Sequence, residues 1–221
     1  MADLPEHVGD PEAGRGVRAF VLELRDVRDV SGFIDTATTY GWAPVVLALA
    51  LHGTVRGVFE HLTDPFIIAS GYWFPGWQFA LLVNIVYGTA IVVFGWFLFF
   101  GLVASIGGYL SSVRHMDVGM FKIGAYLSLV FIPVFVIGSI ISLTLTVPEA
   151  LVVGTADETA HTYVRRTLQL QLVAFLRGLT WIVIGFVLLP IVADRYALDR
   201  KASVVAVLPP TMGAILATQL V

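Results

Sequence analysis

The chain has 221 residues and a formal net charge of −3; 57% of the residues are hydrophobic and only 13% are charged. An average soluble domain carries about 25% charged residues, whereas here the mean hydropathy is +0.86. These values exclude a soluble globular enzyme. The absence of cysteine excludes disulfides and thiolate chemistry, and the small net charge gives no argument for a nucleic-acid partner.

The N-terminal region divides into two parts. Residues 1–16 are polar and acidic and lack the basic and apolar regions of a cleaved signal, so we expect a flexible tail. Residues 17–35 place Val17, Phe20 and Leu24 at helical spacing, with Arg18 and Arg25 on the other side. This pattern predicts an amphipathic interfacial helix, which either lies in the headgroup plane or packs beneath the bundle as a lead-in to the first span.

Residues 36–221 contain five segments that pass the length test for a membrane-spanning helix, which needs about 20 apolar residues. They are residues 40–59, 79–110, 121–147, 170–193 and 202–221. As a helix, the second segment would be about 48 Å long, which favours one tilted or protruding helix over two spans. The sequence therefore predicts an all-α fold: a polytopic membrane helix bundle with about five transmembrane helices and an N-terminal amphipathic helix.

The basic residues predict the orientation of this bundle. Lys and Arg are concentrated before the first span, after the second span and between the fourth and fifth spans, and are sparse in the other two loops. Cytoplasmic loops carry an excess of these residues. We therefore expect an integral protein of the cell membrane, with its N-terminus in the cytoplasm and its C-terminus outside.

Four polar side chains fall inside or at the edge of the predicted spans: His52, Arg56, Asn84 and Arg177. Ionisable groups in a membrane often mark a functional pathway, and His52 and Arg56, four residues apart, share a helix face. One interpretation is a polar pathway or an anion site. The other is structural: Arg56 extends to water at the outer interface, and Arg177 does the same or pairs with Glu60 or Asp64.

The predicted outer loops carry two clusters of potential metal ligands. Glu60, His61 and Asp64 form one, and Asp157, Glu158 and His161 form the other. Glu158 and His161 make an E-x-x-H pair, but di-metal bundles need two such pairs and further carboxylates inside the core. We therefore expect no bound metal.

Enzymatic and cofactor signatures are also missing from the sequence. A b-type haem needs a pair of axial ligands, and only His52 lies in a span. No Walker A, H-E-x-x-H or G-x-S-x-G pattern occurs. His115 and Asp117, in the short inner loop, are expected to be solvated. We therefore expect neither a cofactor nor an enzymatic activity.

Small residues recur at four-residue spacing and predict close helix packing, either within the bundle or between copies of it. They are Gly53, Gly57, Gly101, Ser105, Ala104, Gly108, Gly138 and Ser142.

The organisation of the chain resembles the Yip family (Ypt-interacting protein domain). The resemblance is carried by a glycine pair, a short loop with a Phe, a Tyr followed by Pro, and a fifth span with a similar start. The residues are Gly107-Gly108, Gly119-Met120-Phe121-Lys122, Gly124-Ala125-Tyr126, Pro133, Lys201-Ala202 and Pro209. The resemblance covers residues 40–221. It implies five spans with the N-terminus inside, and eukaryotic members of the family act in vesicle traffic.

Two functional hypotheses follow from these observations. The first is a non-enzymatic scaffold or subunit of a membrane protein complex, which acts through membrane lipids, other membrane subunits or self-association. The second is a small transporter or channel component with a polar pathway near His52, Arg56, Asn84 and Arg177.

Overall fold

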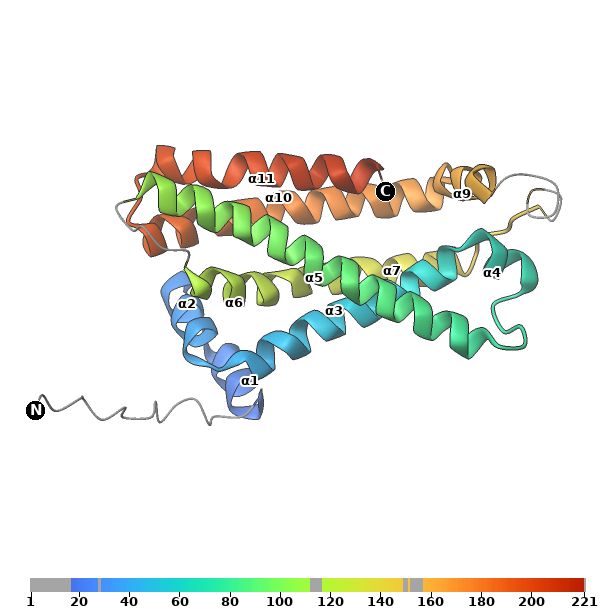
Figure 1. Cartoon of the computed structure of the whole chain (residues 1–221), viewed down its shortest axis with the longest axis horizontal. Coiled ribbons are helices and arrows are strands. Elements are labelled where there is room, and N and C mark those ends of the chain that lie inside the picture. Colours follow the sequence, from blue (N-terminus) through green and yellow to red (C-terminus); the bar gives the residue numbers. More distant parts are fainter. Residues whose placement is uncertain (1–16, 28, 112–116, 149–150, 152–156, 221) are drawn as a thin grey trace, which may run out of the picture.

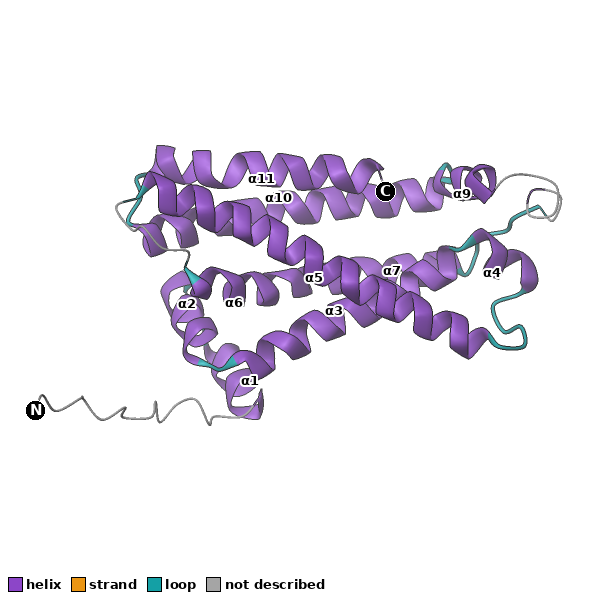
Figure 2. Cartoon of the chain, in the orientation of Figure 1, coloured by secondary structure: helices purple, strands orange, loops and turns teal. Residues whose placement is uncertain are grey.

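The computed structural model describes residues 17–27, 29–111, 117–148, 151 and 157–220. Every regular element in these ranges is helical (Figure 2), and the helices form an elongated bundle (Figure 1). Five spans are long and apolar enough to cross a membrane. They are α3 (Trp42–Thr63), α5 (Trp77–Leu110), the consecutive α6 (Val118–Leu127), η1 (Ser128–Val130) and α7 (Phe131–Ser142), α10 (Leu168–Tyr196) and α11 (Arg200–Leu220). The prediction of an all-α membrane bundle is confirmed, and α5 is one long helix.

Within the described residues, four shorter helices lie at the two ends of this bundle. They are α1 (Val17–Asp26), α2 (Val30–Thr39), α4 (Pro65–Ser70) and α9 (Asp157–Arg165). In Figure 1, α2 lies at the end where α6 begins, and α4 and α9 lie at the opposite end. We call these the α2 end and the α4 end.

The single helix predicted over residues 17–35 is instead two helices, α1 and α2. Asp29 separates them: its backbone is extended, and its Oδ1 accepts a hydrogen bond from the Gly32 N–H at 2.7 Å. This is an N-cap, which begins a new helix. Phe20 of α1 is buried, and its ring stacks at 4.6 Å on Tyr126 of α6. Part of the apolar face of α1 therefore packs against the bundle.

The first span extends beyond the predicted boundary at residue 59 and ends at Thr63. Asp64 then adopts an extended conformation, and its Oδ1 accepts hydrogen bonds from the N–H groups of Phe66 and Ile67. Asp64 thereby begins α4, with Pro65 at the first helical position, where its missing N–H costs nothing. Glu60 and His61, predicted in a loop, consequently lie in the last turns of α3.

The third span is interrupted at its middle and ends at Ser142, earlier than the predicted residue 147. The interruption is the 3-10 turn η1, which separates α6 from α7. Pro133 explains it, because proline has no N–H to donate and its ring collides with the carbonyl group four residues earlier, that of Leu129. After Ser142 the chain forms turns through Leu145 and leaves the helix.

The backbones of α3 and α5 come into direct contact at three glycines: Gly53 and Gly57 of α3 and Gly88 of α5. A Cβ atom on Gly57 would lie 2.6 Å from the Asn84 carbonyl oxygen, and a Cβ atom on Gly88 would lie 2.8 Å from the Gly57 nitrogen. Real Cβ atoms are almost never this close to other heavy atoms. Small residues allow this approach, which maximises dispersion contacts in a membrane. We call this contact the glycine seam.

Gly138 and Ser142 of α7 also take part in packing within the bundle. A Cβ atom on Gly138 would lie 2.9 Å from the Phe59 ring of α3. The Ser142 hydroxyl donates to the Gly138 carbonyl at 2.7 Å, and the Ser142 carbonyl accepts from the Tyr72 hydroxyl at 2.9 Å. Burial raises the pKa of Tyr72, so the phenol keeps the proton that it donates.

The remaining small residues on α5 are less crowded. A Cβ atom on Gly101 would only make an ordinary contact, 3.7 Å from the Phe121 ring. Ser105 is exposed, Gly108 is partly buried and Ala104 is fully buried.

Replacing Gly57 with alanine should destabilise the bundle by about 2 kcal/mol, because the added methyl group forces α3 and α5 apart. The measurement is thermal or denaturant unfolding of the purified protein in detergent. Gly95→Ala on α5 is the matched control, since nothing lies within 4 Å of its Cβ position and alanine favours a helix by about 1 kcal/mol. Equal stability of the two variants would contradict the packing of the glycine seam.

Candidate functional site

One face of α3 carries three polar side chains in a row: His52, Arg56 and Glu60. They are four residues apart and therefore project from the same side of the helix. Arg56 donates from Nε to Glu60 Oε1 at 3.1 Å, and its Nη2 lies 3.0 Å from the same oxygen. The Arg56 side chain is 12% exposed and that of Glu60 is 31% exposed. The row thus becomes more accessible toward the α4 end of the bundle.

His52 lies at the deep end of this row, about 16 Å from the end of α3 by helical rise. Its residue is 7% exposed, and its imidazole stacks on the Phe131 ring at 5.6 Å with an interplanar angle of 7°. The Phe135 ring lies 5.8 Å away. The Nδ1 atom is buried and makes no hydrogen bond. His52 therefore faces the start of α7, directly after the break in the third span.

Arg177 joins this group from α10, about 14 Å inside the helix. Its guanidinium carbon lies 5.8 Å over the centre of the Phe135 ring, a cation–π geometry. His52 contacts the same Phe135 ring, and Arg56 follows His52 by one turn of α3. Three of the four polar residues predicted in the spans, namely His52, Arg56 and Arg177, thus lie in one region of the bundle. We call these three residues together with Glu60 the polar site.

Asn84, the fourth predicted residue, lies in the glycine seam. Its Nδ2 is 3.4 Å from Nδ1 of His61, which is 3% exposed. His61 follows Gly53 and Gly57 at four-residue spacing and therefore continues the face of α3 that contacts α5. Asn84 and His61 thus satisfy each other beside the polar site, on a neighbouring face of α3.

The polar site carries more positive than negative charge among the described residues. It contains two guanidinium groups, on Arg56 and Arg177, and one carboxylate, on Glu60. Glu60 accepts a hydrogen bond from Arg56, whereas the guanidinium of Arg177 makes a cation–π contact with the Phe135 ring. In a low-dielectric interior, such an excess charge attracts an anion strongly.

The second cluster of potential ligands lies on α9, at the α4 end. Glu158 is exposed, whereas His161 is partly buried, with its ring 6.3 Å from that of Phe66 on α4; the side chain of Asp157 lies outside the described residues. Among the described side chains, no three His, Asp or Glu residues are placed to hold a metal ion.

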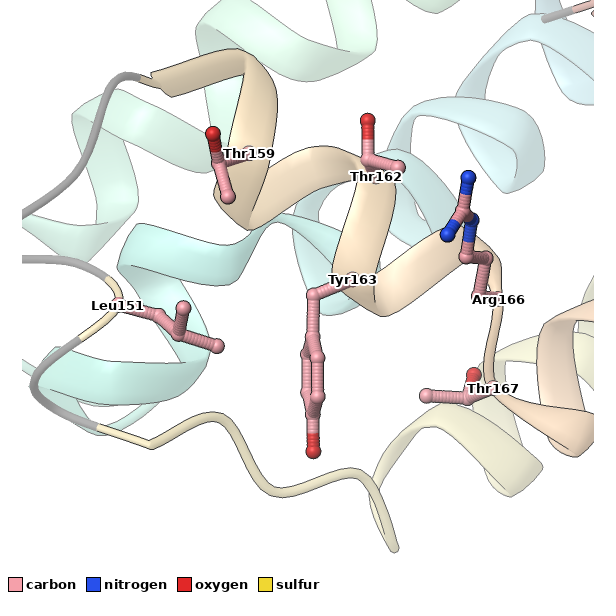
Figure 3. Close-up of a pocket in the computed structure, with 6 residues that line it drawn as sticks. All are labelled: Leu151, Thr159, Thr162, Tyr163, Arg166 and Thr167. Carbon is pink, nitrogen blue, oxygen red and sulfur yellow. The ribbon is translucent and has the colours of Figure 1, made fainter.

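A cavity of about 440 Å³ lies beside α9 (Figure 3). Its lining comprises Leu151, Thr159, Thr162, Tyr163, Arg166 and Thr167. Tyr163 extends from α9 into this space, whereas Thr162 and Arg166 point the other way in Figure 3. Arg166 and Tyr163 are both exposed, so the charge beside this hollow lies in solvent, whereas the charged side chains of the polar site are partly buried.

At the α2 end, Asp117 is a structural anchor and not the solvated loop residue that the sequence predicted. It accepts two hydrogen bonds from Arg195 of α10, one from Nε and one from Nη2, both at 2.7 Å. Its Oδ1 also accepts from the Gly119 N–H at 2.9 Å and so caps α6. A Cβ atom on Gly119 would lie 2.7 Å from Arg195 Nη2, so a larger residue there would displace the guanidinium that Asp117 binds. His115 lies outside the described residues.

Lys122 of α6 secures the end of α2 at the same place. Its Nζ donates to the carbonyl oxygens of Thr38 at 3.0 Å and Tyr40 at 2.6 Å, and lies 5.9 Å from the Trp42 ring. A cation at a helix C-terminus is favourable, because unpaired carbonyl groups point at it. The Asp117–Arg195 pair and Lys122 thus tie α2, α6 and α10 together.

Replacing Asp117 with alanine should destabilise the protein by about 2–3 kcal/mol, because it removes the cap of α6 and leaves a partly buried guanidinium unpaired. Asp199→Ala is the matched control: Asp199 caps α11 from an exposed position, accepting from the Ala202 N–H at 2.7 Å, and should cost about 1 kcal/mol. Unfolding in detergent measures both. A double-mutant cycle with Arg195→Gln should give a coupling energy of about 2 kcal/mol; additive effects would contradict the pairing.

Comparison with known proteins identifies no family for this chain: no protein-family model matches it, and neither a curated protein nor a solved structure is detectably similar.

Proposed function

We propose that this membrane protein is a small transporter or channel component, in which the polar site forms part of the pathway. The observation that carries the proposal is the convergence of His52, Arg56 and Arg177 from two helices inside the bundle. Charged side chains are costly in a membrane and usually face a pathway or a binding site. Two arginine side chains and a buried imidazole in one region of the bundle are more polar groups than helix packing requires.

The surroundings of the polar site support the proposal. Toward the α4 end, the row of polar residues on α3 ends at Glu60, whose side chain is partly exposed to solvent. Toward the α2 end, the neighbouring residues of α3 are the buried and apolar Val45, Ala48 and Leu49. The arrangement corresponds to a pathway that is accessible from one side and closed on the other. The broken third span beside His52 adds to this, since transporters commonly place discontinuous helices next to their binding sites.

In this proposal the α2 end lies at the cytoplasmic face. The distribution of Lys and Arg in the sequence supports that orientation, as cytoplasmic flanks are rich in both. The polar site then opens toward the outside of the cell.

A scaffold or subunit of a membrane complex, as in the Yip-like resemblance, is the second candidate. The observation that favours it is the apolar face of α5, where Phe79, Val86, Phe94 and Phe97 are exposed. Such a face accepts lipid tails or the helix of another subunit. The two candidates differ in solute flux, which only the first requires.

Reconstitution into liposomes tests the transport proposal. The protein should conduct a small ion, detected with potassium-, chloride- and proton-sensitive dyes. Arg177→Leu and His52→Ala should each lower the flux about tenfold or more, since each removes a polar group from the pathway.

Gly95→Ala is the matched control and should leave the flux unchanged, and size-exclusion chromatography and circular dichroism should show all variants assembled. If the wild-type protein transports none of the three ions above the leak of empty liposomes, or if both variants transport as the wild type does, the transport proposal is wrong.

A further inference from the structure

The partly buried charges of the polar site sum to one excess positive charge, from Arg56, Arg177 and Glu60. Among the described residues, no carboxylate forms an ion pair with Arg177. The Glu60 carboxylate is already paired with Nε and Nη2 of Arg56. The guanidinium of Arg177 contacts an aromatic face, which offers a weak partial charge and no hydrogen-bond acceptor of the strength of a carboxylate. Arg177, which is partly buried, therefore lacks a full counter-charge.

His52 adds an unused polar atom at the same place. Its residue is more than nine-tenths buried, and Nδ1 has no hydrogen-bond partner. His52 and Arg177 contact the same ring, that of Phe135, each at 5.8 Å. Buried polar atoms are usually satisfied; six side-chain atoms of the described residues are exceptions, and His52 Nδ1 is the one in the polar site. An imidazole that carries its proton on Nδ1 is a donor, as is every nitrogen of a guanidinium.

These two observations point to the same ligand chemistry. We propose that the polar site binds one small monovalent anion of the size of chloride, held between Arg177, Arg56 and His52 and entering past Glu60 from the α4 end. One negative charge balances the excess guanidinium, and the anion accepts hydrogen bonds from the donors. Two guanidinium groups repel cations.

The neighbouring aromatic rings favour a small anion over a large one. The Phe131 ring stacks on the His52 imidazole, the Phe135 ring lies tilted beside it, and Phe59 packs on Phe135 at 5.4 Å. Apolar walls offer no further donors, so a divalent oxyanion would leave most of its oxygens and one charge unsatisfied. The inference rests on the polar site of the proposed function and names the ion that it handles, but binding is measured separately from flux.

The test is anion-dependent stability of the purified protein in detergent. Sodium chloride should raise the thermal midpoint in a saturable way relative to sodium gluconate at equal ionic strength, because a ligand that binds the folded state stabilises it. Bromide and nitrate should act like chloride. In Arg177→Gln, the chloride concentration that gives half of the maximal shift in thermal midpoint should rise about tenfold or more, as expected when a charge-assisted hydrogen bond is lost. Arg165→Gln, which removes an exposed arginine of α9, is the matched control and should leave the shift unchanged.

A second measurement covers a failure of Arg177→Gln to fold. The chloride-35 resonance should broaden in the presence of wild-type protein and sharpen again when bromide is added in excess. Arg177→Lys, which keeps the positive charge, should retain the broadening. A stability shift equal in gluconate and chloride, no broadening by the wild type, or an unchanged shift in a folded Arg177→Gln would each overturn the anion site.

The outcomes separate this inference from the proposed function. Chloride binding that depends on Arg177, combined with no flux in liposomes, supports the anion site and overturns transport. Cation flux through the wild type without any chloride binding overturns the anion site and leaves transport standing.

Discussion

The contact between the backbones of α3 and α5 is the constraint on which the rest of the bundle depends. Gly53, Gly57 and Gly88 allow the two helices to touch without side chains between them. Because this contact uses one face of α3, it also sets the rotation of that helix. The neighbouring face, with His52, Arg56 and Glu60, must then turn toward α7 and α10. The position of the polar site is thus a consequence of the glycine seam.

The break in the third span acts together with this constraint. Pro133 ends the regular hydrogen-bond pattern at η1, and α7 begins with an aromatic residue beside the buried imidazole. Phe135, one turn further on, contacts both His52 and Arg177. An aromatic face is one of the few apolar surfaces that also attracts a cation, so it permits an arginine at this depth without a second carboxylate. The result is an electropositive interior lined by rings.

Much of the architecture could be predicted, whereas the partners of the polar residues could not. The predicted end of the first span stopped short of Glu60 and His61, although Asp64-Pro65 is a recognisable start of a new helix and marks the boundary. The prediction of Asp117 as a solvated loop residue is similarly wrong, although an acidic residue directly before an apolar run is a typical N-cap. Its second role, the pairing with Arg195, had no local signal, because 78 positions separate the two residues.

The sequence by itself determined that this is a helical membrane protein with five spans, because length, hydropathy and the lack of charge act locally along each segment. It also determined which few polar groups had to be accommodated in the membrane. Only the tertiary structure decided that Arg177 meets His52 and Arg56 while Asn84 meets His61. The physical reason is that helix rotation and contact depend on packing between distant segments, here set by glycines on α3 and α5, and no periodicity within one segment encodes it.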